Sequence, residues 1–122
     1  MLTLLLATAA LSGHAPVWMG CERTPATRPA RVIVACADAN FYVDHLRWTS
    51  WKASSATATG TAHANDCTPY CAAGHFHAFE VRVRLSKPVA CAKGRRVFAR
   101  IAWTAAARKP PYPNGSETLG CT

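Results

Sequence analysis

The stretch FEVRVRL (residues 79–85) alternates apolar and charged side chains without interruption. Because successive side chains of a β-strand point to opposite faces, this period of two predicts a strand with one buried and one solvated face. Lys87 and Pro88 follow, and we expect them to end the strand because proline cannot donate a ladder hydrogen bond. This segment makes β-structure the expectation for the rest of the chain.

Further strands are predicted on both sides of this segment by β-branched, aromatic and alternating apolar residues. They lie at residues 31–36, 41–51 and 96–103. Trp48 and Trp103 are the expected aromatic members of the core. Simple alternation places Trp48 and Trp51 on opposite faces of their strand, so both faces of that strand are expected to carry a large aromatic side chain.

The remaining segments are less regular. Residues 54–64 (SSATATGTAHA) predict a weak strand that is bulged near Gly60, or equally a loop. Turn formers and two cysteines predict a long structured loop at residues 65–77. The proline-rich tail at residues 108–122 is expected to be extended, with a turn at Asn114. Five or six short strands with irregular links predict an all-β fold, either a small antiparallel sandwich or a partly open barrel.

Residues 1–11 (MLTLLLATAAL) form an uncharged apolar run that is too short to span a bilayer. The run predicts a signal peptide at residues 1–15, followed by a single β-rich domain with a proline-rich tail at residues 16–122. The alternative is a buried first element of a cytoplasmic protein. All six cysteines follow the leader, and an even count in a small exported chain predicts disulfides and secretion. No transmembrane segment is expected in the mature chain.

Six cysteines allow fifteen pairings. A bond across a three-residue turn that contains proline is sterically easy. The ends of predicted strands favour a second bond that closes a long loop, and termini that lie close together favour the third. The expected pairings are Cys67–Cys71, Cys36–Cys91 and Cys21–Cys121. An alternative for the first cysteine is lipid attachment, because Cys21 directly follows Gly20.

The chain is basic. Fourteen Lys and Arg residues against six Asp and Glu residues give a formal net charge of +8, and ten of the fourteen are arginines. This balance favours anionic partners such as an envelope polymer, lipid phosphates or an acidic glycan, while solubility alone is the alternative. Binding to a specific nucleic acid is not expected.

Three short motifs occur together in the order found in a known group of proteins. They are ACADAN at residues 35–40, LRWTSW at residues 46–51 and CTPYCAAG at residues 67–74. They resemble the ACADGN-like, LxWxxW and CxPxCAxG-like segments of a group of small secreted proteins from actinobacteria. Ala39 stands where that group tends to have glycine. The resemblance implies export and an all-β build, and it supplies no catalytic residue.

A stripe of arginines is the first candidate site. If residues 79–85 and 96–103 form paired strands, one face carries four basic side chains with an aromatic ring between them. The members of this stripe are Arg82, Arg84, Arg96, Arg100 and Phe98. Guanidinium groups bind phosphates and carboxylates, and aromatic rings stack on bases or sugars. The leading interpretation is therefore a secreted, non-catalytic domain that binds an anionic envelope polymer or an acidic glycan without a cofactor. The alternative is a solvated sheet face.

A metal site is the second hypothesis. His63, Cys67, Cys71 and His75 are spaced H-x3-C-x3-C-x3-H, and His77 follows. Two thiolates and two imidazoles would satisfy tetrahedral zinc, and copper accepts the same donors. The sequence favours a disulfide beside exposed histidines instead, because exported cysteines are usually oxidised.

A small hydrolase is the third hypothesis. Asp66 and His75 could form an acid–base pair. The alternative is that Asp66 stabilises a loop through hydrogen bonds to the backbone. The chain contains no nucleophile elbow, phosphate loop or zinc-protease motif, so the sequence favours a role without catalysis.

Overall fold

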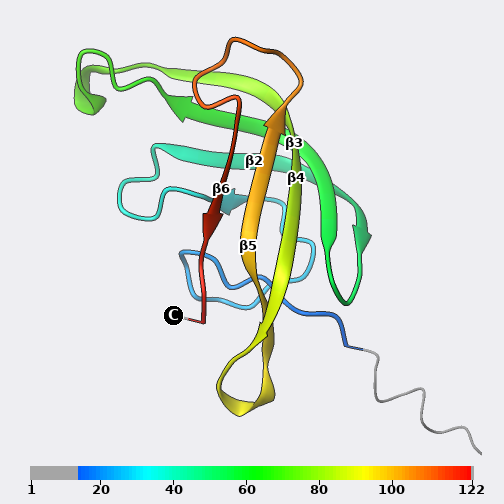
Figure 1. The fold of residues 1–122 in the computed structure, drawn as a ribbon. Coiled ribbons are helices and arrows are strands. Elements are labelled where there is room, and N and C mark those ends of the chain that lie inside the picture. Colours follow the sequence, from blue (N-terminus) through cyan, green and yellow to red (C-terminus); the bar gives the residue numbers. More distant parts are fainter. Residues whose placement is uncertain (1–13, 122) are drawn as a thin grey trace, which may run out of the picture.

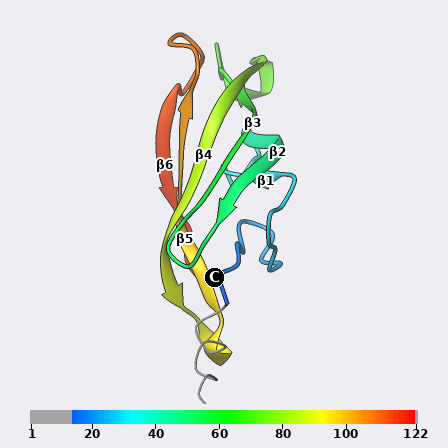
Figure 2. The same ribbon diagram turned by 90° about the vertical axis from the view of Figure 1, so that its right-hand side faces the viewer.

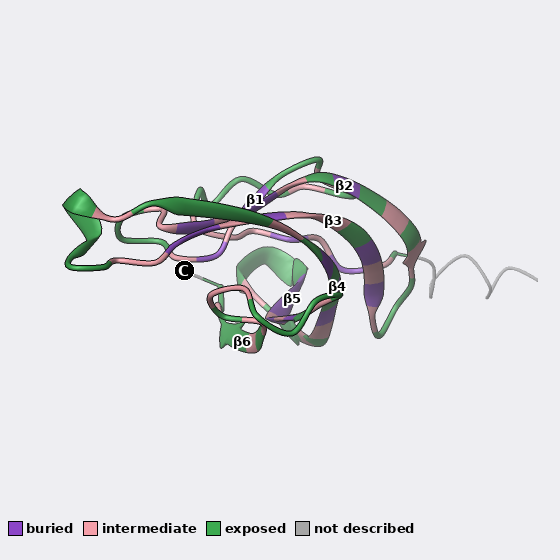
Figure 3. Ribbon diagram, turned by 90° about the horizontal axis from the view of Figure 1, so that it is seen from above, coloured by how far each residue is buried: buried purple, intermediate pink, exposed green. Residues whose placement is uncertain are grey.

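The computed structural model describes residues 14–121, which form one antiparallel sheet whose strand order is the sequence order (Figure 1). The six strands are β1 (Val32–Ile33), β2 (Phe41–Trp51), β3 (Ala56–Asn65), β4 (Phe76–Ala90), β5 (Arg96–Ala105) and β6 (Asn114–Thr118). Two short 3₁₀ helices, η2 (Cys71–Ala73) and η3 (Ala92–Gly94), lie in the connections. Seen from above, the sheet curls into a half-barrel (Figure 3). The predicted all-β, disulfide-bonded fold is confirmed, and it takes the open-barrel form.

Strand β3 shows how the two faces of the sheet are built. Its alanines are at most 1% exposed, whereas the threonines between them are exposed or half-buried. The alanines are Ala56, Ala58, Ala62 and Ala64. The face that carries them is called the inner face here, and the opposite one the outer face. The alternation of Ala with Thr therefore encodes a strand, and the loop alternative for residues 54–64 is wrong.

The small alanines leave room for large side chains on the neighbouring strands. Ala58 pairs with Trp48 of β2 on one side and with Val83 of β4 on the other. Val83 in turn pairs with Trp103 of β5, whose ring meets Phe41 edge-on at 4.7 Å. The inner face thus buries two predicted core tryptophans, Trp103 almost fully and Trp48 in part. Truncating one such ring typically costs about 3–5 kcal/mol.

Strand β2 contains two bulges. At the first, His45 adopts a left-handed backbone (φ +52°) between Asp44 and Arg47. The bulge lies against Gly60, where an added Cβ would come within 2.8 Å of the Asp44 carbonyl oxygen. The irregularity predicted near Gly60 is present, but the extra residue belongs to β2.

The second bulge lies between Trp48 and Ser50 and changes the side on which the following residues point. Trp48 and Trp51 consequently share the inner face and meet edge-on at 4.8 Å. The expectation that the two rings lie on opposite faces is therefore wrong, because an extra residue in one strand reverses the alternation.

Strand β4 continues through Pro88, so the predicted end at Lys87 and Pro88 is wrong. The pairing of β4 with β3 stops at Leu85, and beyond it β4 pairs with β5. Pro88 faces Phe98, whose N–H donates to the Val17 carbonyl oxygen at 3.0 Å and not to β4. The proline thus costs no ladder hydrogen bond. The β4–β5 hairpin projects beyond the body of the sheet (Figures 1 and 2).

The tail contains a strand that the sequence did not predict. Asn114 starts β6 and does not lie in the predicted turn. Gly115 faces Trp103, and an added Cβ at Gly115 would lie 2.7 Å from the indole ring. At the opposite edge, β1 contains only two of the six residues 31–36 that were predicted as a strand.

The disulfides join neighbours in the fold. The bonds are Cys21–Cys36, Cys67–Cys71 and Cys91–Cys121. The bond across the three-residue turn is the expected one, and the pairings Cys36–Cys91 and Cys21–Cys121 are wrong. Cys36 lies next to β1 at one edge of the sheet, whereas Cys91 and Cys121 lie beside β5 and β6 at the other. Because the Cys21 sulfur is bonded to Cys36, the structure also contradicts lipid attachment at that sulfur.

The segment before Cys21 packs onto the sheet. Pro16 is fully buried, and its carbonyl oxygen accepts a hydrogen bond from Trp51 Nε1 at 2.9 Å. Trp18 belongs to the core. The predicted signal peptide, residues 1–15, lies almost wholly outside the described residues. Among those residues there is no helix of the length and apolarity needed to cross a bilayer.

Candidate functional site

The outer face of the sheet carries rows of polar side chains that the strand register aligns. One row runs across five strands and consists of Arg47, Thr59, Arg82, Thr104 and Asn114. The next row consists of Ser50, Thr57, Arg84, Ala102 and Ser116. Arg100 lies one row further on, opposite Ser86. The structure thus brings together three of the predicted arginines and adds one from β2. We call Arg47, Arg82, Arg84 and Arg100 the outer arginine cluster.

The spacing within the outer arginine cluster follows from sheet geometry. Arg47 and Arg82 are two strands apart, which separates their backbones by about 10 Å. Arg82 and Arg84 are neighbours on one side of β4, about 7 Å apart. Arg84 and Arg100 are diagonal neighbours on adjacent strands, at a similar distance of about 7 Å. All but Arg100, which is half-buried, are exposed to solvent.

Two residues predicted for this face lie elsewhere. Phe98 is only 1% exposed and packs edge-on against Trp51 at 5.5 Å, so the expectation of an aromatic ring among the arginines is wrong. The N-terminal segment covers this part of β5 through the hydrogen bond between Phe98 N–H and Val17. Arg96 faces Ala90 in the projecting hairpin, about 13 Å along β5 from Arg100.

Arg96 belongs to a second group of cations. We call this group the hairpin cations: Lys87, Lys93, Arg95 and Arg96. All four side chains are exposed. The projecting hairpin and the outer arginine cluster are therefore separate cationic surfaces, and the predicted stripe is wrong in placing Arg96 with Arg82, Arg84 and Arg100.

The formal charge of the protein is unevenly distributed along its sequence. Residues 1–80 contain five basic and five acidic side chains, whereas residues 81–122 contain nine basic side chains and one acidic side chain. The whole formal charge of +8 therefore belongs to the segment that forms most of β4 and all of β5 and β6. Counting the charge of each half separately could have revealed this asymmetry from sequence alone.

In the part of the chain that the structure describes, the arginines lack ion-pair partners. Within residues 14–121, every ion pair shorter than 4.0 Å joins a histidine to Asp44 or Asp66. The lowered pKa of Asp44 reflects chiefly its hydrogen bond with His45 and also the bond with His63. Like charges on neighbouring strands repel each other. An anionic ligand would relieve the repulsion within the outer arginine cluster.

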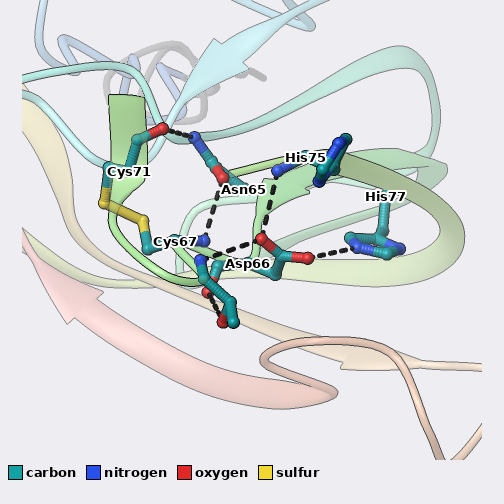
Figure 4. A network of polar contacts seen from close by, with 7 residues as sticks. Asn65, Asp66, Cys67, Cys71, His75 and His77 are labelled. Atoms are coloured by element: carbon teal, nitrogen blue, oxygen red, sulfur yellow. Dashed lines mark hydrogen bonds and ion pairs between the residues drawn. A yellow bond between two sulfur atoms is a disulfide. The ribbon is translucent and has the colours of Figure 1, made fainter. Parts of the chain in front are cut away.

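The loop that follows β3 is organised by two adjacent polar residues (Figure 4). Asn65 is 4% exposed, and its Nδ2 donates to Asn40 Oδ1 at 3.0 Å and to the Cys71 carbonyl oxygen at 2.8 Å. Asn65 Oδ1 accepts from Cys67 N–H at 2.9 Å. Gly74 is required at the end of the loop, because an added Cβ would lie 2.2 Å from Asn65 Oδ1.

Asp66 completes this loop, residues 66–75, which we call the Asp66 loop. Its Oδ1 accepts from the backbone N–H groups of Thr68 and His75, both at 3.1 Å, and its Oδ2 pairs with His77 Nε2 at 2.9 Å. These bonds, above all the one with His77, lower the pKa of Asp66 to about 2. The predicted pairing of Asp66 with the His75 ring is not formed. Asp66 acts here through hydrogen bonds that stabilise the loop.

The five side chains of the metal hypothesis are not assembled into one site. Cys67 and Cys71 form a disulfide and offer no thiolates. His63 Nε2 bonds with Asp44 at 2.9 Å, and its ring stacks on Tyr42 at 4.6 Å. Within the part of the chain that the structure describes, no cluster of three or more side chains suited to hold a metal ion is present.

Comparisons of the chain with protein-family models, with curated proteins and with solved structures find no match. The sheet and the three disulfides define a disulfide-bonded, all-β domain, and its surface carries two exposed groups of cations.

Proposed function

We propose that this chain is an exported, non-catalytic binding domain whose outer arginine cluster contacts an anionic polymer of the cell envelope or an acidic glycan. The observation that carries the proposal is the convergence of four arginines from three strands on one face, none of which forms an ion pair with another of residues 14–121. Three disulfides and the resemblance to small secreted actinobacterial proteins support export.

The sheet suits such recognition for two physical reasons. Guanidinium groups hold carboxylates, sulfates and phosphates through paired hydrogen bonds, so several arginines at fixed spacing recognise a repeating anion. The backbones of β2, β4 and β5 are fixed by the ladders, and binding orders only side chains. The hydroxyl group of Thr59 lies between Arg47 and Arg82 and offers hydrogen bonds to the same ligand.

The test is retention on immobilised heparin in a salt gradient. The wild-type protein should be retained at low salt and released as the salt concentration rises, because exposed charges are screened. A variant of the outer arginine cluster should elute in the loading buffer. The variant is R47Q/R82Q/R84Q/R100Q.

Two further variants remove the same number of charges from other surfaces. The hairpin variant is K87Q/K93Q/R95Q/R96Q, and the loop variant, whose four residues lie outside the strands, is R23Q/R28Q/R108Q/K109Q. Both should remain bound at low salt and elute somewhat earlier than the wild type. Equal losses in all three variants would mean that only net charge matters, and a selective loss in the hairpin variant would place the contact there. Either result overturns the proposal. Thermal melts verify that each variant is folded.

A further inference from the structure

We infer that the ligand is an acidic glycan that donates hydroxyl groups to Glu80, and not a polymer of bare phosphates; this inference rests on the proposed function. The outer face carries two adjoining depressions of about 450 and 390 Å³. Thr59 and Glu80 line both of them. Pockets for small ligands span about 300–1,000 Å³, so each depression has the size to hold one small unit of a chain.

Each depression contains one member of the outer arginine cluster. Arg82 lines the larger depression, together with Thr104, and Arg47 lines the smaller one, together with Thr61. The two arginines face Thr59 from opposite sides, with a backbone separation of about 10 Å. A ligand that crosses both depressions therefore meets a cation, a polar middle and a second cation.

Glu80 lines both depressions and determines what the part of the ligand that lies beside Arg82 must offer. Its side chain is exposed, and it lies two residues from Arg82 on the same face of β4. Within residues 14–121, Glu80 forms no ion pair shorter than 4.0 Å, whereas Asp44, across Thr61, is bonded to two histidines. An ionised carboxylate only accepts hydrogen bonds.

This chemistry separates two kinds of anionic polymer. A chain of phosphates offers no donor next to Glu80, so Glu80 would only repel it. A sugar offers hydroxyl groups there, and hydrogen bonds to a charged acceptor are the stronger kind. Two arginines on either side of Thr59, with Glu80 beside Arg82, fit a glycan that carries acidic groups and also presents hydroxyl groups where the two depressions adjoin.

The test compares two probes, hyaluronan and inorganic polyphosphate, with wild-type protein and the Glu80→Gln variant. We expect Glu80→Gln to weaken hyaluronan binding about tenfold, because a charge-assisted hydrogen bond is lost. The same change should strengthen polyphosphate binding, because a repulsive charge is removed. Glu22 is an exposed acidic residue that lines neither depression. Glu22→Gln is therefore the matched control, and it should strengthen the binding of both probes slightly.

Two results would overturn the inference while the proposed function stands. One is that Glu80→Gln leaves hyaluronan binding unchanged or strengthens it. The other is that the wild type binds polyphosphate more tightly than hyaluronan at equal charge concentration. A double variant, R47Q/R82Q, tests the proposed function separately. If it binds both probes like the wild type, the outer arginine cluster is not the contact surface.

Discussion

Replacing Asn65 by aspartate should destabilise the domain strongly, although the two side chains are nearly equal in size. The two side chains have the same shape, but a carboxylate cannot donate the hydrogen bonds that Nδ2 makes to Asn40 and Cys71. Each lost bond costs about 1 kcal/mol, and the buried negative charge then faces two acceptors. We expect the free energy of unfolding to fall by about 3 kcal/mol at pH 7, which corresponds to more than about 10 °C in Tm for a domain of this size.

The matched control makes the same chemical change at the other end of the hydrogen bond. Asn40 Oδ1 accepts from Asn65, and the carboxylate of an Asn40→Asp variant also accepts. That variant should stay within about 1 kcal/mol of the wild type. Both variants add one negative charge at nearly the same place, so a difference between them reports the lost donor and not the charge.

The pH dependence of Asn65→Asp gives a second readout. Burial and two neighbouring acceptors should raise the pKa of the new carboxyl group in the folded state above its unfolded value. The penalty is therefore present at high pH and shrinks as the pH falls through the folded pKa, because a protonated carboxyl group can donate one bond again. Denaturant unfolding followed by tryptophan fluorescence at pH 7 and pH 4, with disulfides intact, measures both effects. Equal midpoints for the two variants at pH 7 would refute the assignment of donor and acceptor.

Ala39 has φ +56°, so Ala39→Gly should raise the free energy of unfolding by about 0.5–1 kcal/mol, seen as a higher denaturation midpoint at unchanged slope; a lower midpoint would contradict this. Replacing Cys91 and Cys121 by alanine opens a ring with a sequence separation of 30 and should cost about 4 kcal/mol, more than removing the bond in the Asp66 loop; the reverse order in thermal melts would argue against chain entropy as the cause. Asp66 has its folded pKa lowered to about 2 from 3.8, so its stabilisation is present above pH 3.8 and is lost as the pH falls through about 2. Asp66→Asn should therefore flatten the decline in Tm between pH 4 and pH 2, and an unchanged decline would mean that the contact with His77 does not stabilise the fold.

The strands with alternating apolar residues or many aromatic and β-branched residues could be predicted from sequence because both patterns favour extended backbone. Residues 79–85 lie within β4, and the range 41–51 matches β2. The faces within β2 could not be predicted, because its bulges depend on a partner strand. The first bulge is accommodated by Gly60, which belongs to β3 and not to β2. No local sequence pattern around Trp48 and Trp51 predicts the second bulge.

The strands with few large apolar side chains were predicted weakly or missed for a different reason. The inner face of β3 is made of alanine, which buries little area and gives a weak hydrophobic signal. Strand β6 (NGSET) has no apolar side chain and is held by ladder bonds to β5 at the edge of the sheet. In both cases the backbone pairing is specific, whereas the side-chain pattern that sequence reasoning relies on is faint.

The candidate site was predictable in part. Arg82, Arg84 and Arg100 share a face because their strands pair as expected. Arg47 was missed because its place in the row of Arg82 depends on β3 between them, and the sequence predicted that strand only weakly. Phe98 was predicted on the wrong surface because the segment that covers it lies about eighty residues earlier in the chain. Local alternation cannot predict such a long-range contact.

The equivalence of strand order and sequence order has a consequence for how this molecule approaches its partner. Because the uncompensated charge belongs to one half of the chain, it also belongs to one half of the sheet, and the centre of charge is displaced from the centre of mass. Such a molecule has a large electric dipole moment and is turned by the field of a polyanion before contact. Fewer encounters then occur in unproductive orientations. Added salt should therefore reduce the association rate constant more than it raises the dissociation rate constant.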